Sequence, residues 1–298
     1  MPNALRRPLT LFALMQIGTL VAAYAEEVPI PSQDDWSDAK QSVTLRNGIS
    51  LSYVEMGPAE GQPTLLLHGY TDNSRSWSLL APHLGDRRLI AVDLRGHGDS
   101  ATPACCYGID TLANDVDGFM DALGVKAADV VGHSLGSMTA ATLAAYYPDR
   151  VDRLVLISTA AAAPAEAADW LWENVSTMEH PIDPDSEFMM NWYWNPTPVD
   201  DDFLSRERAE SAQTSETTWM GVLRALTFTD WTKMAPHIEA PTLILWGDQD
   251  SLFGSDSQVQ IQHILPQAKH VTYEGHGHNM FWEVPDKVGQ DVADFLDR

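Results

Sequence analysis

The stretch Val130-Val131-Gly132-His133-Ser134-Leu135-Gly136 decides how the chain is interpreted, because it places a G-x-S-x-G pattern between an apolar run and a small-residue helical run. A sharp turn from strand to helix lifts a serine hydroxyl clear of its neighbours and points helix N-terminal amides at developing negative charge. A serine becomes a strong nucleophile only when a base removes its proton. We therefore predict that Ser134 is a catalytic nucleophile rather than part of a simple Gly-Ser turn.

Apolar runs of the kind buried in a parallel sheet recur along the chain, and helical patterns separate them. The expected strands are 64–68, 89–94, 129–132, 154–158, 242–246 and 271–273. The expected helices are 76–84, 109–123, 137–147, 256–265 and 285–296, and residues 43–56 indicate a β-hairpin around Asn47-Gly48. Strands that alternate with helices predict an α/β fold whose mostly parallel sheet carries helices on both faces.

The alternation is interrupted between residues 160 and 237, where no strand is expected but six tryptophans occur. We interpret 160–237 as a helical cap inserted into a core formed by 26–159 and 238–298. The alternative is an ordinary helical subdomain that packs its own side chains. Ligands bind at the carboxyl ends of such strands, so a cap above them would face the substrate. The expected substrate-binding residues of the cap are Trp192, Trp194 and Met190.

A nucleophilic serine needs a base to accept its proton and an acid to orient that base. The candidate bases are His276 and His278, in a loop after the last expected strand of the sheet. The candidate acids are Asp248 and Asp250, just beyond the strand at 242–246. The order serine, aspartate, histidine along the chain is the one expected for a sheet enzyme of this type. The spacing alone leaves both choices open.

Five segments are informative together because they occur in a fixed order. They are His68-Gly69-Tyr70, Asp93 to Ser100, Gly132-His133-Ser134-Leu135-Gly136, Trp246-Gly247-Asp248-Gln249-Asp250, and His278 followed by Glu283-Val284-Pro285. Through them the chain resembles the α/β-hydrolase fold family, in its group of capped esterases, C–C hydrolases and haloperoxidase-like proteins. The resemblance runs from about residue 43 to residue 298. It implies the family's eight-stranded type of sheet with a helical cap.

The resemblance settles the two open choices. In the family pattern the catalytic histidine lies five residues before a Glu-x-Pro, which selects His278 over His276. The catalytic acid is the last residue of the W-G-x-x-D motif, which selects Asp250 over Asp248. The implied catalytic residues are therefore Ser134, Asp250 and His278.

The resemblance also implies an oxyanion hole built from the backbone amides of Leu135 and Tyr70. Only backbone groups act there, so the side chains of both residues are free to vary. No metal or organic cofactor is expected. The histidines inside the other family motifs are expected to be structural, namely His68, His97 and His133.

Acidic residues outnumber basic ones by 42 to 18, which gives a formal net charge of −24. Such a surface repels nucleic acid and anionic lipid, so neither is expected as a partner. Residues 1–25 have a basic start, a short apolar run and a small-x-small end, a pattern typical of a secretory signal peptide rather than a membrane anchor. We expect a periplasmic or secreted protein that is free of the membrane once this segment is cleaved.

Cys105 and Cys106 are the only cysteines, and they are adjacent. In an oxidising compartment they either close a strained vicinal disulfide or remain thiols. The sequence leaves both outcomes open.

The expected function is hydrolysis of carboxylic esters, lactones included, through an acyl-enzyme. The tryptophans and methionines of 160–237 favour an apolar or aromatic small-molecule substrate. The enzymatic alternative is C–C bond hydrolysis of ring-cleavage products by the same triad. A ligand-binding protein without turnover is a further alternative, since such proteins keep the same motifs. The acyl chain, the alcohol and the oligomeric state do not follow from one sequence.

Overall fold

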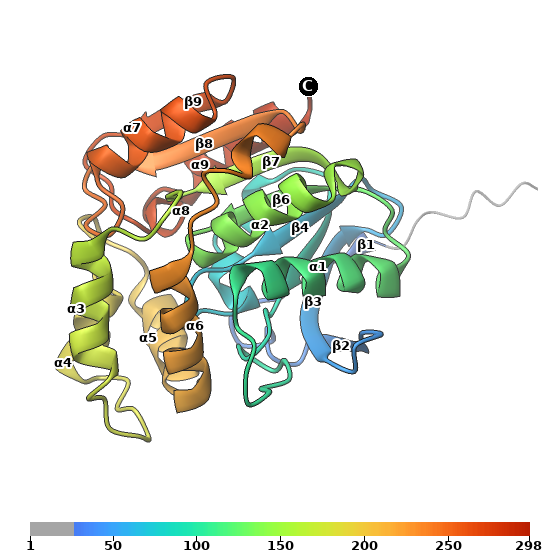
Figure 1. Cartoon of the computed structure of the whole chain (residues 1–298). Helices are drawn as coiled ribbons and strands as arrows, with labels where there is room; N and C mark the ends of the chain where they lie inside the picture. Colours follow the sequence, from blue (N-terminus) through green and yellow to red (C-terminus); the bar gives the residue numbers. More distant parts are fainter. Residues whose placement is uncertain (1–26) are drawn as a thin grey trace, which may run out of the picture.

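The computed structural model describes residues 27–298, which form a mostly parallel sheet with helices on both of its faces (Figure 1). The strands are β1 (Glu27–Val28), β2 (Gln41–Thr44), β3 (Ser50–Pro58), β4 (Pro63–Leu67), β5 (Arg88–Val92), β6 (Ala128–His133), β7 (Val151–Ile157), β8 (Thr242–Gly247) and β9 (Lys269–Tyr273). Their order is β1-β3-β5-β4-β6-β7-β8-β9, with β2 paired to β3 outside this path. Pairing is antiparallel at β3 and parallel from β5 to β9. The predicted fold class is confirmed.

The α-helices of residues 27–298 follow most of the sequence predictions. They are α1 (Ile109–Leu123), α2 (Leu135–Tyr146), α3 (Ala165–Val175), α4 (Glu187–Trp192), α5 (Asp201–Ala212), α6 (Glu216–Phe228), α7 (Ser255–Ile264), α8 (Met280–Glu283) and α9 (Pro285–Leu296). In Figure 1, α1 and α2 pass in front of the strands and α9 passes behind them. Helix α1 buries Leu112, Val116 and Phe119, which share one face at helical spacing. Strand β6 is buried along its whole length, as expected for a strand covered on both faces.

Helices α3 to α6 all fall within residues 160–237 and stand together at one end of the sheet (Figure 1). Three of them have an N-cap residue whose side chain accepts a hydrogen bond from the amide three residues later. These N-cap residues are Ser186, Asp200 and Ser215. Within this segment, every residue of which is described, β pairing is limited to one bridge between Ala162 and Asp230. Trp219 and Trp231 are buried, so part of the tryptophan content does pack an internal core.

The structure corrects one predicted helix. Residues 76–84 do not form an α-helix. Two short 3-10 helices, η1 (Ser74–Trp77) and η2 (Ala81–His83), are joined here by a turn at 78–80. Pro82 lies in the second of these, and a proline inside an α-helix removes a hydrogen bond and clashes with the preceding turn. Asn73 caps the first by accepting a hydrogen bond from the amide of Arg75. The two short turns therefore replace one continuous helix.

Two further predictions concern the N-terminal segment and the two cysteines. The predicted signal peptide at 1–25 lies outside the described residues. None of the helices between residues 27 and 298 is long and apolar enough to cross a bilayer. Cys105 and Cys106 are joined by a disulfide in the loop that leads from β5 to α1, which is one of the two outcomes that the sequence left open.

Candidate active site

Ser134 lies on a tight turn between the end of β6 and the first residue of α2. Its backbone has a φ of 50° and a ψ of −115°, and such sparsely populated conformations cost about 1–3 kcal/mol and cluster at functional sites. A Cβ on Gly132 would lie 2.3 Å from the carbonyl oxygen of Gly136, so only glycine fits there. The local sequence therefore builds a strained turn that holds Ser134 at the N-terminus of a helix.

Gly136 brings α2 against the end of β4. A Cβ at this position would lie 2.0 Å from the carbonyl oxygen of Leu67. The close approach sets the amide of Leu135, in the first turn of α2 where amides have no intrahelical partner, beside the loop that follows β4. That loop carries Tyr70, whose amide has no hydrogen-bond acceptor within residues 27–298. The oxyanion hole expected from the amides of Leu135 and Tyr70 stays a prediction.

His278 and Asp250 come from the loops that follow β9 and β8, and Nδ1 of the imidazole lies 2.9 Å from Oδ2 of the carboxylate. The other carboxylate oxygen accepts hydrogen bonds from the amides of Leu252 and Phe253, each 2.9 Å long. Burial raises the pKa of Asp250, but His278 and the two amides outweigh it and hold the pKa below its usual range. The ionised carboxylate can only accept, so it fixes the histidine proton on Nδ1 and leaves Nε2 as the base.

The backbone of His278 is anchored to the turn that carries Ser134. Its carbonyl oxygen accepts a hydrogen bond of 2.6 Å from the hydroxyl of Ser158 and one of 3.1 Å from Nε2 of His133. Because a carbonyl only accepts, His133 carries its proton on Nε2. Burial lowers the pKa of His133 well below its usual range, so this ring is neutral. His133 positions the histidine loop through this contact.

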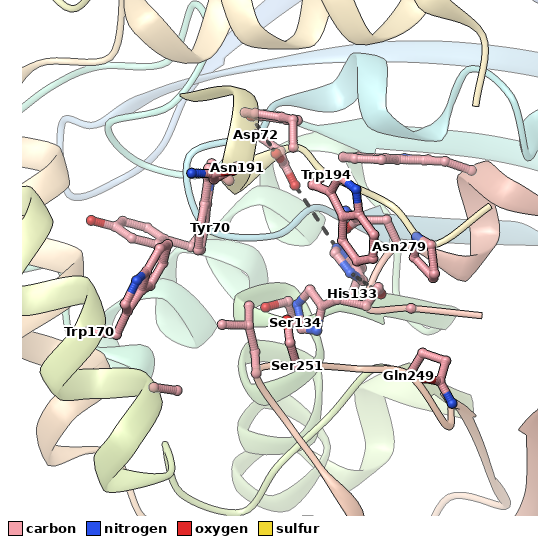
Figure 2. A pocket seen from close by; sticks show the side chains of 18 of the residues that line it. Tyr70, Asp72, His133, Ser134, Trp170, Asn191, Trp194, Gln249, Ser251 and Asn279 are labelled. Atoms are coloured by element: carbon pink, nitrogen blue, oxygen red, sulfur yellow. Dashed lines mark hydrogen bonds and ion pairs between the residues drawn. The ribbon is translucent and has the colours of Figure 1, made fainter. Parts of the chain in front are cut away.

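Ser134 and His278 line one cavity of about 330 Å³. Figure 2 shows Ser134 at the bottom of this space, with Tyr70 and Trp170 on one side and Trp194 on the other. In the described part of the chain no hydrogen bond joins the Ser134 hydroxyl to the imidazole. Catalytic hydrogen bonds are often long in free enzymes and tighten when substrate binds. The cavity thus brings together a strained serine and an oriented imidazole.

Residues 62–285 match the alpha/beta hydrolase fold family. The chain belongs to the alpha/beta hydrolase fold family. It is 26% identical over 245 residues to 3-oxoadipate enol-lactonase 2 of Acinetobacter baylyi, covering 81% of this chain and 91% of that one. It is also 26% identical over 268 residues to a 2-hydroxy-6-oxononadienedioate/2-hydroxy-6-oxononatrienedioate hydrolase of Paraburkholderia phymatum, covering 85% and 93%. The solved structure of a membrane phospholipase A is 30% identical with a TM-score of 0.75, covering 87% of this chain and 85% of that one.

In this alpha/beta hydrolase the expected substrate-binding residues separate into two groups. Trp192 and Trp194 line the cavity, and Trp170, which the sequence analysis did not single out, lines it with them. Met190 is 49% exposed and is not among the residues that line this cavity. Its neighbour Met189 is the buried residue of α4 instead, because successive helical residues point about 100° apart. The expectation for Met190 is therefore wrong.

Asp72 is a cavity residue that the sequence analysis missed. It is buried in the loop after Tyr70 and accepts a hydrogen bond of 2.9 Å from the hydroxyl of Tyr193. Burial raises its pKa to about 7, although Tyr193 and His278 act in the opposite direction. Figure 2 shows Asp72 above the same space that Ser134 faces. A carboxyl group with such a perturbed pKa in a cavity is a candidate functional residue.

The two rejected candidates for acid and base lie elsewhere, since neither Asp248 nor His276 lines the cavity. Asp248 accepts a hydrogen bond of 2.7 Å from the amide of Gly275, and Nδ1 of His276 lies 3.0 Å from Oε2 of Glu283. Both hold loops together. Residues 27–298 contain no group of three or more His, Cys, Asp or Glu side chains placed to hold a metal ion.

Proposed function

We propose that this alpha/beta hydrolase is a serine hydrolase that cleaves carboxylic esters, including lactones, of apolar or aromatic character. The observation that carries the proposal is geometric. Ser134 on its strained turn and His278, paired at 2.9 Å with Asp250, line the same cavity. Both observations support a serine–histidine–aspartate mechanism. The lactonase and phospholipase to which the chain is similar support ester chemistry.

The reaction has two stages. In the first, Nε2 of His278 takes the hydroxyl proton of Ser134 as the serine oxygen attacks the acyl carbon, and Asp250 stabilises the imidazolium. The amides of Leu135 and Tyr70 hold the negative charge of the tetrahedral intermediate. The bond to the alcohol then breaks, and the alcohol leaves with the proton from His278.

In the second stage a water molecule gives its proton to His278 and attacks the acyl-enzyme. A second tetrahedral intermediate forms in the same oxyanion hole. Its collapse releases the carboxylic acid, and Ser134 takes back a proton from His278. The net reaction adds one water across the ester bond.

The walls of the cavity support a substrate of moderate size with apolar groups. Trp170, Trp192 and Trp194 line it together with Leu252. A volume of about 330 Å³ lies near the lower end of ligand cavities, which span about 300–1,000 Å³. The substrate we propose therefore carries a short acyl chain or a single ring rather than a long lipid tail.

A second candidate is C–C bond hydrolysis, which the similarity to the Paraburkholderia phymatum hydrolase supports. The dioates in that relative's name carry two carboxylates. The cavity of this chain is lined by the acidic residues Asp72 and Glu166 instead, and none of its lining residues, all within the described chain, is a lysine or an arginine. The unfavourable encounter of like charges places C–C hydrolysis of such compounds second.

The test is turnover of short p-nitrophenyl esters by the wild type and by the Ser134→Ala variant. We expect multiple turnover by the wild type and its loss in Ser134→Ala, with unchanged circular dichroism. Ser176→Ala, a change at an exposed serine that does not line the cavity, serves as the matched control and should retain activity. Residual turnover by Ser134→Ala at the wild-type rate would exclude the serine mechanism, and tight ligand binding without turnover by the wild type would identify a binding protein.

We further propose that the protein is exported, with residues 1–25 removed. The basic and apolar pattern of 1–25 and the Cys105–Cys106 disulfide support export, since disulfides persist in oxidising compartments. Fractionation of expressing cells, followed by mass spectrometry of the N-terminus, tests this. We expect a chain that begins at Glu26 in the periplasmic or extracellular fraction; an uncleaved chain in the cytoplasm would exclude export.

A further inference from the structure

The ionisable side chains that face the cavity give it an acidic character. Asp72 and Glu166 both line it, and they come from the loop after β4 and from α3. His133 also lines it but is neutral, because burial lowers its pKa well below the usual range. None of the lining residues, which all lie within the described part of the chain, is a lysine or an arginine.

Basic side chains near the Asp72 loop are already engaged. Arg75 donates a hydrogen bond of 2.6 Å to Glu210, and Nζ of Lys40 lies 2.8 Å from Asp93. Neither basic residue lines the cavity. A substrate carboxylate placed there would find no cation to offset the loss of its hydration, and an uncompensated charge in a buried site is strongly unfavourable. The cavity is therefore unfavourable for anionic substrates.

The tryptophans that line the cavity, Trp170, Trp192 and Trp194, favour a cationic substrate. Trp170 and Trp192 stack with their ring centroids 6.2 Å apart and their planes 20° apart. Figure 2 shows Trp170 and Trp194 on either side of the space that Asp72 faces. The face of a tryptophan ring attracts a cation within about 6 Å, and the attraction is stronger when the cation is desolvated. Tryptophans and acidic residues that line one cavity are a combination that suits an ammonium group.

The net negative charge of the whole protein also favours cationic substrates. With 42 acidic and 18 basic residues, the protein generates a negative potential that concentrates cations at its surface and raises their association rates. A cavity of the same sign extends that attraction to the reacting atoms. The same potential lowers the local concentration of anionic esters.

We propose that the cavity selects esters that carry an alkylated ammonium group, which binds between the tryptophans Trp170 and Trp194 and the carboxylates of Asp72 and Glu166. The inference rests on the ester-hydrolase function proposed above and names the substrate class of that site. The methyl groups of an alkylated ammonium are apolar and suit the aromatic wall. Its positive charge is offset by the two carboxylates.

The decisive comparison uses two esters of the same shape and different charge. Acetylcholine carries a trimethylammonium group, and 3,3-dimethylbutyl acetate replaces its nitrogen by carbon. We expect kcat/KM for the cationic ester to exceed that for the neutral one by at least about tenfold, as a cation–π contact and a carboxylate together imply. A ratio near one, with p-nitrophenyl acetate still hydrolysed, overturns the inference and leaves the ester-hydrolase function intact.

Variants show whether the acidic residues cause the selectivity. Asp72→Asn and Glu166→Gln keep the shape of each side chain, and we expect each to lower the ratio of cationic to neutral kcat/KM, with the double variant approaching one. Asp169→Asn is the matched control, because Asp169 is an exposed acid on the same helix as Glu166 and does not line the cavity. It should keep the wild-type ratio. An undiminished ratio in the double variant overturns the assignment.

A binding measurement separates this inference from catalysis. Choline and 3,3-dimethyl-1-butanol are the alcohols of the two esters, and their affinities for Ser134→Ala can be measured by calorimetry. We expect choline to bind at least about tenfold more tightly than the neutral alcohol. This result supports the inference even if the wild type hydrolyses neither ester. Equal affinities overturn it.

The pH dependence of the selectivity gives an independent readout. The Asp72 carboxyl faces Tyr193, His133, His278 and Glu207, and its pKa lies at about 7 because it is buried. A cation is attracted to the ionised carboxylate only. The ratio of cationic to neutral kcat/KM should therefore rise as the pH rises through about 7. Asp72→Asn should flatten the profile, and a flat wild-type profile excludes Asp72 from the site.

Discussion

The hydroxyl of Tyr193 donates a hydrogen bond of 2.9 Å to the carboxyl group of Asp72. This bond joins the end of α4 to the loop that carries the Tyr70 amide. The preceding residues of that loop make similar bonds, since the Tyr70 hydroxyl donates to the carbonyl of Trp219 and Thr71 accepts from Nε1 of Trp192. Helices α4 and α6 thus hold the predicted oxyanion donor through consecutive residues.

Loss of the Tyr193 hydroxyl should therefore impair activity. In Tyr193→Phe the buried carboxyl of Asp72 loses its donor, which costs about 1–3 kcal/mol. We expect a lower melting temperature and a decrease in kcat/KM of about tenfold or more, because the loop is less firmly held. Steady-state kinetics and thermal unfolding measure both effects. Tyr146→Phe, a change at a 46% exposed tyrosine on α2, is the control and should behave as the wild type; equal behaviour of Tyr193→Phe would contradict the coupling.

The acid of the proposed triad can be tested without loss of the fold. Asp250→Asn keeps the shape of the side chain but no longer favours the histidine tautomer with its proton on Nδ1. By analogy with the serine protease triad we expect kcat to fall about 10⁴-fold, with little change in the melting temperature. Asp248→Asn is the control, since that aspartate binds the amide of Gly275 and does not line the cavity. If the two variants were equally active, Asp250 would not be the catalytic acid.

The close approach of α2 to β4 gives a third prediction. In Gly136→Ala the new methyl group meets the carbonyl oxygen of Leu67 at 2.0 Å, so the helix N-terminus must shift and the Leu135 amide with it. Loss of one oxyanion donor typically lowers kcat by about 10²- to 10³-fold, and we expect a loss of that order together with a lower melting temperature.

The control for Gly136→Ala is a glycine with room for a methyl group. Gly118 lies inside α1, and the nearest atom to an added Cβ is a side-chain carbon of Leu45 at 3.8 Å. Gly118→Ala should raise stability by about 0.5–1 kcal/mol, because alanine favours the helix. Full activity in Gly136→Ala would show that the approach of α2 to β4 does not set the geometry of the site.

Much of the fold could be predicted from the sequence because its signals are local. The apolar runs of a buried parallel sheet are continuous, and the final helix was expected at 285–296, where α9 (Pro285–Leu296) is found. The helix expected at 76–84 failed because its apolar spacing was given more weight than Pro82. A single proline outweighs periodicity when it lies inside one turn of a short segment.

The residues of the site also differ in whether a local sequence pattern reveals them. The motif residues around Ser134 have a local pattern that the sequence displays. Asp72 has none, because its role depends on Tyr193, which lies 121 residues further along the chain. For Met190 the difficulty was helix phase, since α4 has six residues and a segment of that length does not reveal which of two adjacent methionines points inward. Contacts between distant segments and the rotation of short helices require the folded structure.

The disulfide leads to a prediction about mass. If Cys105 and Cys106 are paired in the protein as produced, the intact mass should be two hydrogens lower than that of the dithiol form. Thiol-reactive reagents should then modify neither cysteine before reduction and both after it. Two free thiols in the freshly isolated protein would contradict the pairing. The control is the Cys105→Ser variant, which has one thiol with or without reductant.

Glu207 gives a prediction about stability. It is fully buried on α5, and neither carboxylate oxygen has a hydrogen-bond partner within residues 27–298. Burial, reinforced by the nearby carboxyl of Asp72, raises the pKa of Glu207 well above its usual range. The folded protein therefore keeps a proton that the unfolded chain has already released, and the stability contributed by this group falls as the pH rises above the usual carboxyl range.

Glu207→Gln should remove that dependence, because glutamine is neutral at every pH and has nearly the same shape. The difference in melting temperature between Glu207→Gln and the wild type should grow as the pH rises from about 5 to about 8, and it should reach at least about 2 °C at the upper end. Calorimetry across this range measures it. The exposed Glu239 provides the control, since Glu239→Gln should follow the wild type at each pH. A difference that stays constant with pH would mean that Glu207 is ionised in the folded protein and finds a partner that its buried position does not suggest.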